Sequence, residues 1–250
     1  MSTYTDSKKL TNRINAHKNF AKYDVNKWAL EKISLKNGEK FLEIGCGTGE
    51  QLIKCAKSCP DSKIIGIDLT DDSLGIIKQT CLKEGLENVI TIKGNMDDLP
   101  ILLNSENDFD VVISCFALYY SKDIPQMISK IKKILKPNGR LFVCGPVEGN
   151  NKELIQFQKD ISESSIKKIR YVMSEDILPE ILKNFSQVHD DYFVNPVEFP
   201  NVESVMSYWK SYYLYEPTIE KEFSNLLKEY FSKNSIFLTT KKILGVLGKA

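Results

Sequence analysis

The chain has 250 residues, of which 42% are hydrophobic, so it can bury a full core as one domain with insertions. Lysine and arginine together number 34, against 33 aspartate and glutamate residues, which gives a formal net charge of +1. A dedicated nucleic-acid-binding protein usually carries a basic excess, so we expect no nucleic-acid partner.

The cysteines and the hydropathy pattern indicate a cytoplasmic protein. None of the six cysteines belongs to a C-x-x-C pair, so we expect reduced thiols rather than disulfides, and no metal. The first thirty residues are polar and charged, unlike a signal peptide. The longest nearly apolar run, Val111–Tyr120, is too short to cross a bilayer, so we expect no membrane partner.

The N-terminal part of the chain is expected to be helical. Apolar side chains recur at helical spacing between residues 4 and 35, which predicts a helical segment over residues 1–36. Phe20 and Tyr23 are the candidates to contact a ligand bound beneath this segment. The alternative, favoured above all for Trp28, is that these aromatic residues dock the segment on a sheet.

The segment FLEIGCGTGE, residues 41–50, is the most informative in the chain. Phe41–Ile44 is a short apolar run typical of a buried parallel strand, and the residues after the glycine-rich turn have helical spacing. This order of elements opens nucleotide-binding α/β sheets, where glycines allow a positive φ and the close approach of a ligand. A second apolar strand ends on Asp68, whose carboxylate is placed to accept hydrogen bonds from ribose hydroxyls. The two features together indicate a cofactor that contains adenosine.

The spacing of the glycines selects among such cofactors. The dinucleotide fingerprint is G-x-G-x-x-G, which seats a pyrophosphate, whereas this chain reads E-x-G-x-G-x-G from Glu43 to Gly49. Glu43 and Glu50 would repel a phosphate, but they suit the sulfonium and ammonium groups of S-adenosylmethionine. The chain therefore resembles the class I (seven-strand, Rossmann-like) S-adenosylmethionine-dependent methyltransferases. A turn that binds no ligand and a turn that binds NAD are the alternatives.

The segments after the second strand continue the resemblance. A helix is expected over Asp71–Glu84 and a third strand over Asn88–Lys93, followed by GNMDDLP at residues 94–100. The family commonly has G-D-x-x-x-L-P here, and the acidic side chain accepts a hydrogen bond from the adenine amine. This chain has Asn95 at that position, whose amide oxygen can still accept, and Asp97 is a second candidate for the same contact.

The next segments complete the expected S-adenosylmethionine-binding core, residues 37–146. Phe109–Tyr120 resembles the family's fourth strand and the loop over the methionine half of the cofactor. A helix is expected over Ile124–Leu135, a turn over Lys136–Arg140 and a fifth strand over Leu141–Gly145. The residues that we assign to the cofactor, or to its product S-adenosylhomocysteine, are Tyr23, Glu43, Gly45, Cys46, Gly47, Gly49, Gln51, Asp68, Leu69, Asn95, Met96, Asp97 and Cys115.

The rest of the chain is expected to add a cap and to close the sheet. Residues 147–234 form a helical cap that includes the sixth strand, Gln187–Phe199, and residues 235–250 form the last strand, which is antiparallel in this family. The expected fold class is therefore α/β, a doubly wound and mostly parallel Rossmann-like sheet with an N-terminal helical lid and a helical cap. Helices of the cap are expected within Lys152–Met173, Ser174–Leu182, Val202–Tyr215 and Ile219–Phe231.

The methyl acceptor is expected at the carboxyl ends of the strands, under the lid and the cap. A hydroxyl acceptor needs a base to take its proton, and Tyr119 and His17 are the candidates. The candidates for acceptor binding are Tyr120, Tyr208, Trp209 and Tyr212. Aromatic stripes at helical spacing are more often core, so the cap aromatics have that alternative role as well.

The resemblance implies methyl transfer to an oxygen or nitrogen of a small-molecule acceptor by in-line displacement, driven mainly by positioning. The N-P-P-Y motif of some nucleobase and amide methyltransferases is absent, and Ser114–Ala117 stands in its place. The alternatives are a methyltransferase that acts on RNA or protein and a protein that binds S-adenosylmethionine without turnover. The sequence does not indicate an oligomeric state.

Overall fold

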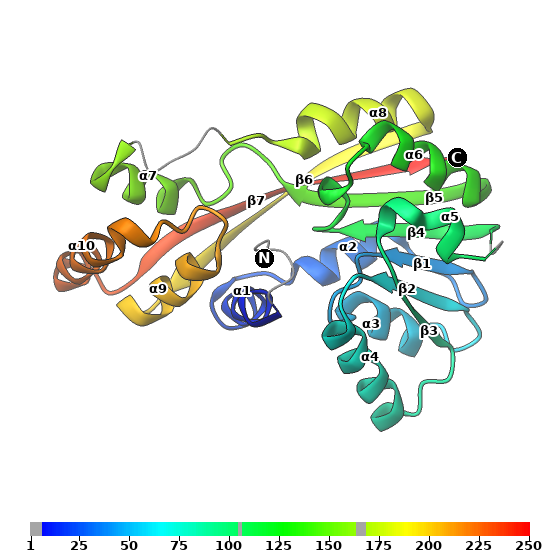
Figure 1. Ribbon diagram of the computed structural model, residues 1–250, viewed down its shortest axis with the longest axis horizontal. Helices are drawn as coiled ribbons and strands as arrows, with labels where there is room; N and C mark the ends of the chain where they lie inside the picture. The colour runs from blue at the N-terminus through cyan, green and yellow to red at the C-terminus, as the bar shows by residue number, and fades with distance from the viewer. Residues whose placement is uncertain (1–6, 105–106, 164–168) are drawn as a thin grey trace. The chain divides into compact units, whose positions relative to one another are not determined.

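The computed structural model describes residues 7–104, 107–163 and 169–250, which contain a seven-stranded sheet (Figure 1). In sheet order the strands are β3 (Val89–Lys93), β2 (Ile64–Asp68), β1 (Phe41–Ile44), β4 (Phe109–Cys115), β5 (Leu135–Pro146), β7 (Phe237–Lys249) and β6 (Ser186–Phe199). The strands from β3 to β5 pair in parallel, whereas β7 is antiparallel to β5. This topology confirms the expected mostly parallel Rossmann-like sheet with an antiparallel last strand.

The chain divides into two compact units. Unit 1 comprises residues Met1–Asp24, Glu148–Arg170 and Phe193–Lys242, and unit 2 comprises Val25–Val147, Tyr171–Tyr192 and Ile243–Ala250. The boundaries predicted at residues 36, 146 and 234 separate a lid, a core and a cap by function, and they stay a prediction. Within unit 1, helix α1 (Ser7–Phe20) packs on helix α9 (Val202–Ser211), and within unit 2, helix α2 (Val25–Ile33) packs on β5.

Unit 2 is built around the parallel strands, of which β1, β2 and β4 are buried on both faces as in other crossover sheets. Its other helices are α3 (Glu50–Ser58), α4 (Asp71–Glu84), α5 (Leu99–Leu102), α6 (Ile124–Ile134) and α8 (Leu178–Asn184). Leu42 and Ile44 of β1 belong to one apolar cluster with Met127 of α6. Because side chains alternate along a strand, Glu43 points to the opposite face, toward α3.

Unit 1 has an aromatic core of its own. It contains α1, α7 (Lys152–Ile161), α9 and α10 (Glu220–Lys233). The fully buried Trp209 ring stacks on Phe223 with 3.9 Å between ring centroids, and Phe157 packs edge-on against Phe223 and Phe237.

No helix in the described part of the chain is long and apolar enough to span a membrane.

The predicted turn at Lys136–Arg140 is wrong, because these residues lie inside β5. Asn138 has the left-handed φ of 66° that suits a turn, but its N–H donates to the Ala250 carbonyl. Ala250 in turn donates to Gly139, so the C-terminal residue keeps this segment in the sheet. The residues that favour a turn instead interrupt the regular pairing of β5 with β4, where the register shifts.

The helix predicted to begin at Ser174 begins differently. A π-helical turn, η4 (Met173–Ile177), precedes α8, and the Glu175 carboxylate accepts the Tyr171 N–H at 3.0 Å. The cap of this segment is therefore the side chain of Glu175, inside the π-helical turn, and not that of the predicted first residue, Ser174. Of the helical pattern predicted over Lys152–Met173, α7 is present, and residues 164–168 lie outside the described residues.

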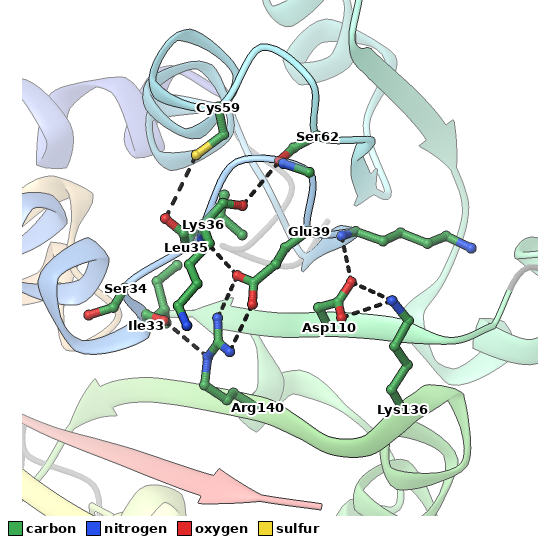
Figure 2. A network of polar contacts seen from close by, with 12 residues as sticks. Ile33, Ser34, Leu35, Lys36, Glu39, Cys59, Ser62, Asp110, Lys136 and Arg140 are labelled. Carbon is green, nitrogen blue, oxygen red and sulfur yellow. Dashed lines mark hydrogen bonds and ion pairs between the residues drawn. The ribbon is translucent and has the colours of Figure 1, made fainter.

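A polar network at the amino ends of β1 and β4 fixes α2 to the sheet (Figure 2). The Arg140 guanidinium donates to both oxygens of Glu39, at 3.0 and 2.7 Å, and to the Ile33 carbonyl at the end of α2. Burial alone would raise the pKa of Glu39, but the hydrogen bonds from Arg140 and the Lys36 N–H lower it below its usual range.

We expect Arg140→Met to lower the free energy of unfolding by about 1–2 kcal/mol, because a bidentate, half-buried ion pair is lost. A carboxyl with a lowered pKa stabilises the fold above its usual pKa and loses that contribution as the pH falls, so the difference between variants should fade below about pH 4. Urea unfolding at neutral and acid pH measures this. Lys233→Met, which breaks the exposed pair with Glu229, is the matched control and should change little. Equal losses in both variants would contradict the assignment.

Candidate active site

The glycine-rich turn joins β1 to α3 through three residues with left-handed backbone. Gly45, Gly47 and Gly49 have φ values of 73°, 52° and 79°. The N–H groups of Gly45 and Cys46 both donate to the Ile67 carbonyl, at 2.8 and 3.0 Å, which fastens the turn to the end of β2. The predicted turn therefore forms, in a conformation that glycine adopts without the cost that a Cβ brings.

Two of these glycines also allow close packing inside the protein. A Cβ on Gly45 would lie 2.2 Å from the Cβ of Ala117, and the Met96 methyl carbon lies 4.0 Å from the same point. A Cβ on Gly49 would lie 2.6 Å from a side-chain carbon of Ile77. The ends of β1, β3 and β4 therefore converge on Gly45.

Asp68 ends β2, and its carboxylate organises the turn. It accepts hydrogen bonds from the Gly47 N–H at 2.8 Å and from the N–H and hydroxyl of Thr70, both at 3.0 Å. An ionised carboxylate has about four acceptor positions, so about one remains for a ribose hydroxyl. The residue has a structural role that the sequence did not reveal, in addition to the predicted one.

Glu43 is a buried carboxyl with one unpaired oxygen. Its side chain is 1% exposed, and its Oε2 makes no hydrogen bond within the described part of the chain. Burial raises the pKa of Glu43 well above its usual range and the nearby charge of Asp68 raises it further, whereas a backbone hydrogen bond from Leu52 acts in the opposite direction. An unpaired oxygen on a buried carboxylate is unfavourable, and a cation would supply the missing partner where a phosphate would not.

The end of β3 separates the two candidates for the adenine contact. The Asn95 side-chain oxygen accepts the Asp97 N–H at 3.0 Å and caps the short helix η1 (Met96–Asp98), which leaves one of its two acceptor positions. The Asp97 carboxylate accepts the Ser121 hydroxyl at 2.6 Å. Asp97 therefore fastens the end of β3 to the segment after β4, and this favours Asn95 as the adenine contact.

The end of β4 carries a strained residue that the sequence did not single out. Phe116 has a φ of 59°, which is unusual for a bulky side chain, and its N–H donates to the Cys144 carbonyl at 2.8 Å. The preceding residue, Cys115, is buried. A hydrogen bond with the Cys144 thiol is the main cause that raises the pKa of Cys115, and burial raises it further. Backbone strain of this kind is typical of functional loops.

The two tyrosines after β4 lie on the short helix η2 (Leu118–Tyr120). Tyr119 is half-buried and packs closely on Gly145, whereas Tyr120 is 43% exposed, and their ring centroids are 4.5 Å apart. Both follow the carboxyl end of β4, the edge at which ligands of this fold bind.

The other predicted cofactor residues of unit 2 surround the same turn. Gln51 is buried in the first turn of α3 and donates to the Asn26 side chain at 2.9 Å, and the buried Cys46 lies within the turn. Leu69, next to Asp68, is 52% exposed and presents an apolar surface. The structure thus brings the predicted residues of β1, β2 and β3 to one edge of the sheet.

The remaining predicted site residues lie in unit 1. Tyr23 is half-exposed, and its backbone N–H and carbonyl bond to the Asn195 side chain at 3.0 and 2.7 Å. Trp209 is fully buried and donates its indole N–H to Gln158 at 2.8 Å, which is the core role that the sequence held as the alternative. Tyr208 is also fully buried, and Tyr212 is nearly so.

His17, a predicted base, packs edge-on against the Tyr208 ring with 5.7 Å between centroids. Burial, and then the charges of Lys241 and Arg13, lower the pKa of His17 to about 3. A histidine with so low a pKa is a weak proton acceptor, so Tyr119 is the better candidate for a base.

Thr70 and Ala117 are residues of this site that the sequence analysis missed. Asp68-Leu69-Thr70 is a local side-chain turn that Asp at its first position could have indicated. Nothing in the sequence indicates that Ala117 meets Gly45, because this contact joins two separate strand ends.

Within the described residues, no group of three or more His, Cys, Asp or Glu side chains is arranged to hold a metal ion.

Comparisons with known proteins agree on one family. A family model described as a methyltransferase domain matches residues 35–208, well over half of the chain. The demethylmenaquinone methyltransferase of Symbiobacterium thermophilum is 33% identical over 123 residues, which are 47% of this chain and 47% of that protein. The chain thus spans about half the length of the curated relatives it matches.

Solved structures share the fold. The YcgJ protein of Bacillus subtilis superposes with a TM-score of 0.63 at 15% identity, over 90% of this chain and 97% of that one. The geranyl diphosphate C-methyltransferase of Streptomyces coelicolor, solved with Mg²⁺, geranyl diphosphate and S-adenosyl-L-homocysteine, gives 0.54 at 15% identity, over 90% and 79%. At such low identity these similarities establish the fold alone.

Proposed function

Because the chain belongs to the methyltransferase domain family and has the class I methyltransferase fold, we propose that it transfers a methyl group from S-adenosylmethionine to a small-molecule acceptor. The observation that carries the proposal is the unpaired buried oxygen of Glu43 beneath the glycine-rich turn. The residues therefore suit a cationic adenosine cofactor better than a dinucleotide.

The proposed roles follow from the geometry of unit 2. The glycine-rich turn and Glu43 hold the methionine portion, Asp68 accepts from the ribose, and Asn95 accepts from the adenine amine. When bound, the cofactor supplies an electrophilic methyl group on a sulfonium. The chain then has to position an acceptor and exclude water, and we assign to Tyr119 the role of taking a proton from an acceptor hydroxyl.

A small-molecule acceptor is supported by the curated relatives, which are named for demethylmenaquinone. An oxygen or nitrogen acceptor atom stays a prediction, and a carbon acceptor is the outcome that would correct it. Methyl transfer to RNA or protein, and binding without turnover, are the competing functions.

The decisive experiment is isothermal titration of the protein with S-adenosylhomocysteine and, in parallel, with NAD. We expect micromolar binding of the former alone, followed by transfer of labelled methyl groups to small-molecule candidates. Binding of NAD alone would overturn the proposal. Binding of S-adenosylhomocysteine with transfer only to RNA or protein would favour the macromolecular alternative.

Asp68→Ala is expected to weaken S-adenosylhomocysteine binding by about 2–3 kcal/mol, through a lost ribose hydrogen bond and a loosened turn. Asp72→Ala removes the same charge from an exposed position on the first turn of α4 and should bind normally. Calorimetry measures both affinities. Near-normal affinity in Asp68→Ala would mean that the ribose lies elsewhere.

Glu43→Gln is expected to abolish a proton release that accompanies cofactor binding. A cation beside Glu43 lowers the raised pKa of this carboxyl, so a proton leaves on binding and the affinity of the natural protein rises with pH. Calorimetry in buffers of different ionisation enthalpy counts the protons released. Glu50→Gln, on the other side of the turn, is the control and should retain the release. A release that survives in Glu43→Gln would assign it to another group.

A further inference from the structure

Unit 1 contains a buried group of basic side chains contributed by α1 and β7. Lys241 of β7 is 9% exposed, and the half-buried Arg13 and His17 come from α1. The charges of Lys241 and Arg13 both act on His17, and Arg13 also acts on Lys241, so the three side chains lie near one another. Each of these three belongs to unit 1, so the group is complete within that unit.

These basic groups have no acidic partner in the described part of the chain. Arg13 donates to the Ser211 carbonyl, and Lys241 makes a single long hydrogen bond of 3.4 Å to the Tyr208 hydroxyl. The remaining donors of the Lys241 ammonium have no acceptor among the described residues. Buried like charges without a counter-charge are unfavourable, and an anion would offset the cost.

Neutral hydrogen-bonding groups from the end of α9 and from the segment before α7 surround the same place. The Tyr208 hydroxyl accepts from the Asn151 amide at 3.1 Å and donates to its oxygen at 3.3 Å, and the Tyr212 hydroxyl accepts from Asn150 at 3.2 Å. The Tyr208 and Tyr212 rings stack with 6.1 Å between centroids, and the Lys241 nitrogen lies 6.0 Å from the Tyr212 centroid. Hydroxyl groups beside an ammonium and a guanidinium that have no acidic partner among the described residues suit carboxylate and phosphate oxygens.

We propose that Arg13, Lys241, Tyr208 and Tyr212 bind a small anion through its carboxylate or phosphate group. This inference goes beyond the proposed function and uses residues of unit 1 alone. It gives Tyr208 and Tyr212, two predicted acceptor-binding residues, a role through their hydroxyls rather than through aromatic contact.

The pH dependence of the site follows from the groups that face it. Burial, and then the charge of Arg13, lower the pKa of Lys241 to about 7, whereas burial raises the pKa of Tyr208 to about 12. His17 and both tyrosines stay neutral from pH 5 to 9. Anion binding should therefore be tight at about pH 6 and should weaken above about pH 7, as Lys241 loses its proton.

The test is titration of the full chain with inorganic phosphate and with benzoate, at about pH 6 and constant ionic strength set with chloride. Binding of one or both is expected, and the tighter probe identifies phosphate or carboxylate as the recognised group. Lys241→Met should weaken it at least about tenfold, and Lys228→Met, at an exposed position of α10, should not. Arg13→Gln, at a half-buried site, provides a second variant should Lys241→Met fail to fold.

Affinity for S-adenosylhomocysteine, measured on the same variants, separates this inference from the proposed function. The expected result is unchanged cofactor affinity with reduced anion affinity. Cofactor binding with no binding of either anion, or with equal anion affinity in Lys241→Met and Lys228→Met, overturns the anion site and leaves the proposed function standing. Anion binding that depends on Lys241 in a protein that binds no cofactor would overturn the proposed function and leave the anion site standing.

Discussion

Gly45→Ala is expected to lower the free energy of unfolding by about 2–4 kcal/mol and to abolish measurable cofactor binding. The new Cβ would lie 2.2 Å from that of Ala117, and the backbone at a φ of 73° is already unfavourable for alanine. Relief requires the ends of β1 and β4 to move apart, which displaces the turn that holds Glu43. Urea unfolding and titration with S-adenosylhomocysteine measure the two effects.

Gly38→Ala separates the clash from the backbone conformation. Gly38 has a φ of 88°, and a Cβ there would meet nothing within 4 Å. This control should cost only about 1 kcal/mol and leave cofactor binding intact. If both variants lost the same stability, the close contact between Gly45 and Ala117 would not be a determinant of the turn.

Lys241→Met is expected to raise the free energy of unfolding, by an amount of the order of 3–5 kcal/mol below pH 7. The pKa of Lys241 is lowered to about 7 in the folded protein, so the unfolded chain holds this proton more tightly between pH 7 and the usual lysine pKa. The natural protein therefore gains stability as the pH rises through that window, and below it carries the full cost of burying the charge. Methionine carries no such cost.

Urea unfolding from about pH 6 to pH 10 measures this change. The natural protein should become more stable with pH, the Lys241→Met variant should follow a flatter curve, and the two should approach each other at high pH. Lys228→Met, whose side chain is exposed, should keep the slope of the natural protein. A natural protein without the slope would mean that Lys241 is paired or hydrated.

The glycine-rich turn of unit 2 could be predicted from the sequence because its conformation is encoded locally. Glycine is favoured where φ is positive, and a carboxylate at the tip of a parallel strand lies where the turn can bond to it, so Gly45 and Asp68 could be interpreted from their neighbours. The unpaired oxygen of Glu43 could not be inferred, because it depends on which polar groups the tertiary structure brings to this side chain.

The cap was less predictable, for a different reason. Tyr208 and Trp209 belong to an aromatic pattern that occurs both in helices packed in a core and in helices that face a ligand. Only the burial of these side chains distinguishes the two kinds of helix. The basic group of unit 1 was invisible in the same way, because Arg13 and Lys241 lie more than two hundred residues apart in the chain. The turn predicted at Lys136–Arg140 failed because the last residue of the chain pairs with this segment.

The division of the chain has a consequence for how the protein is made. Neither unit is one continuous stretch, and β7 passes from one to the other between Lys242 and Ile243. During translation, the aromatic core of unit 1 is therefore incomplete until Phe237 is made, and β5 lacks its antiparallel neighbour until Ile243–Lys249 have emerged. Such distant pairings give a high contact order and slow folding. The nascent chain therefore exposes apolar strands and helices until β7 is synthesised.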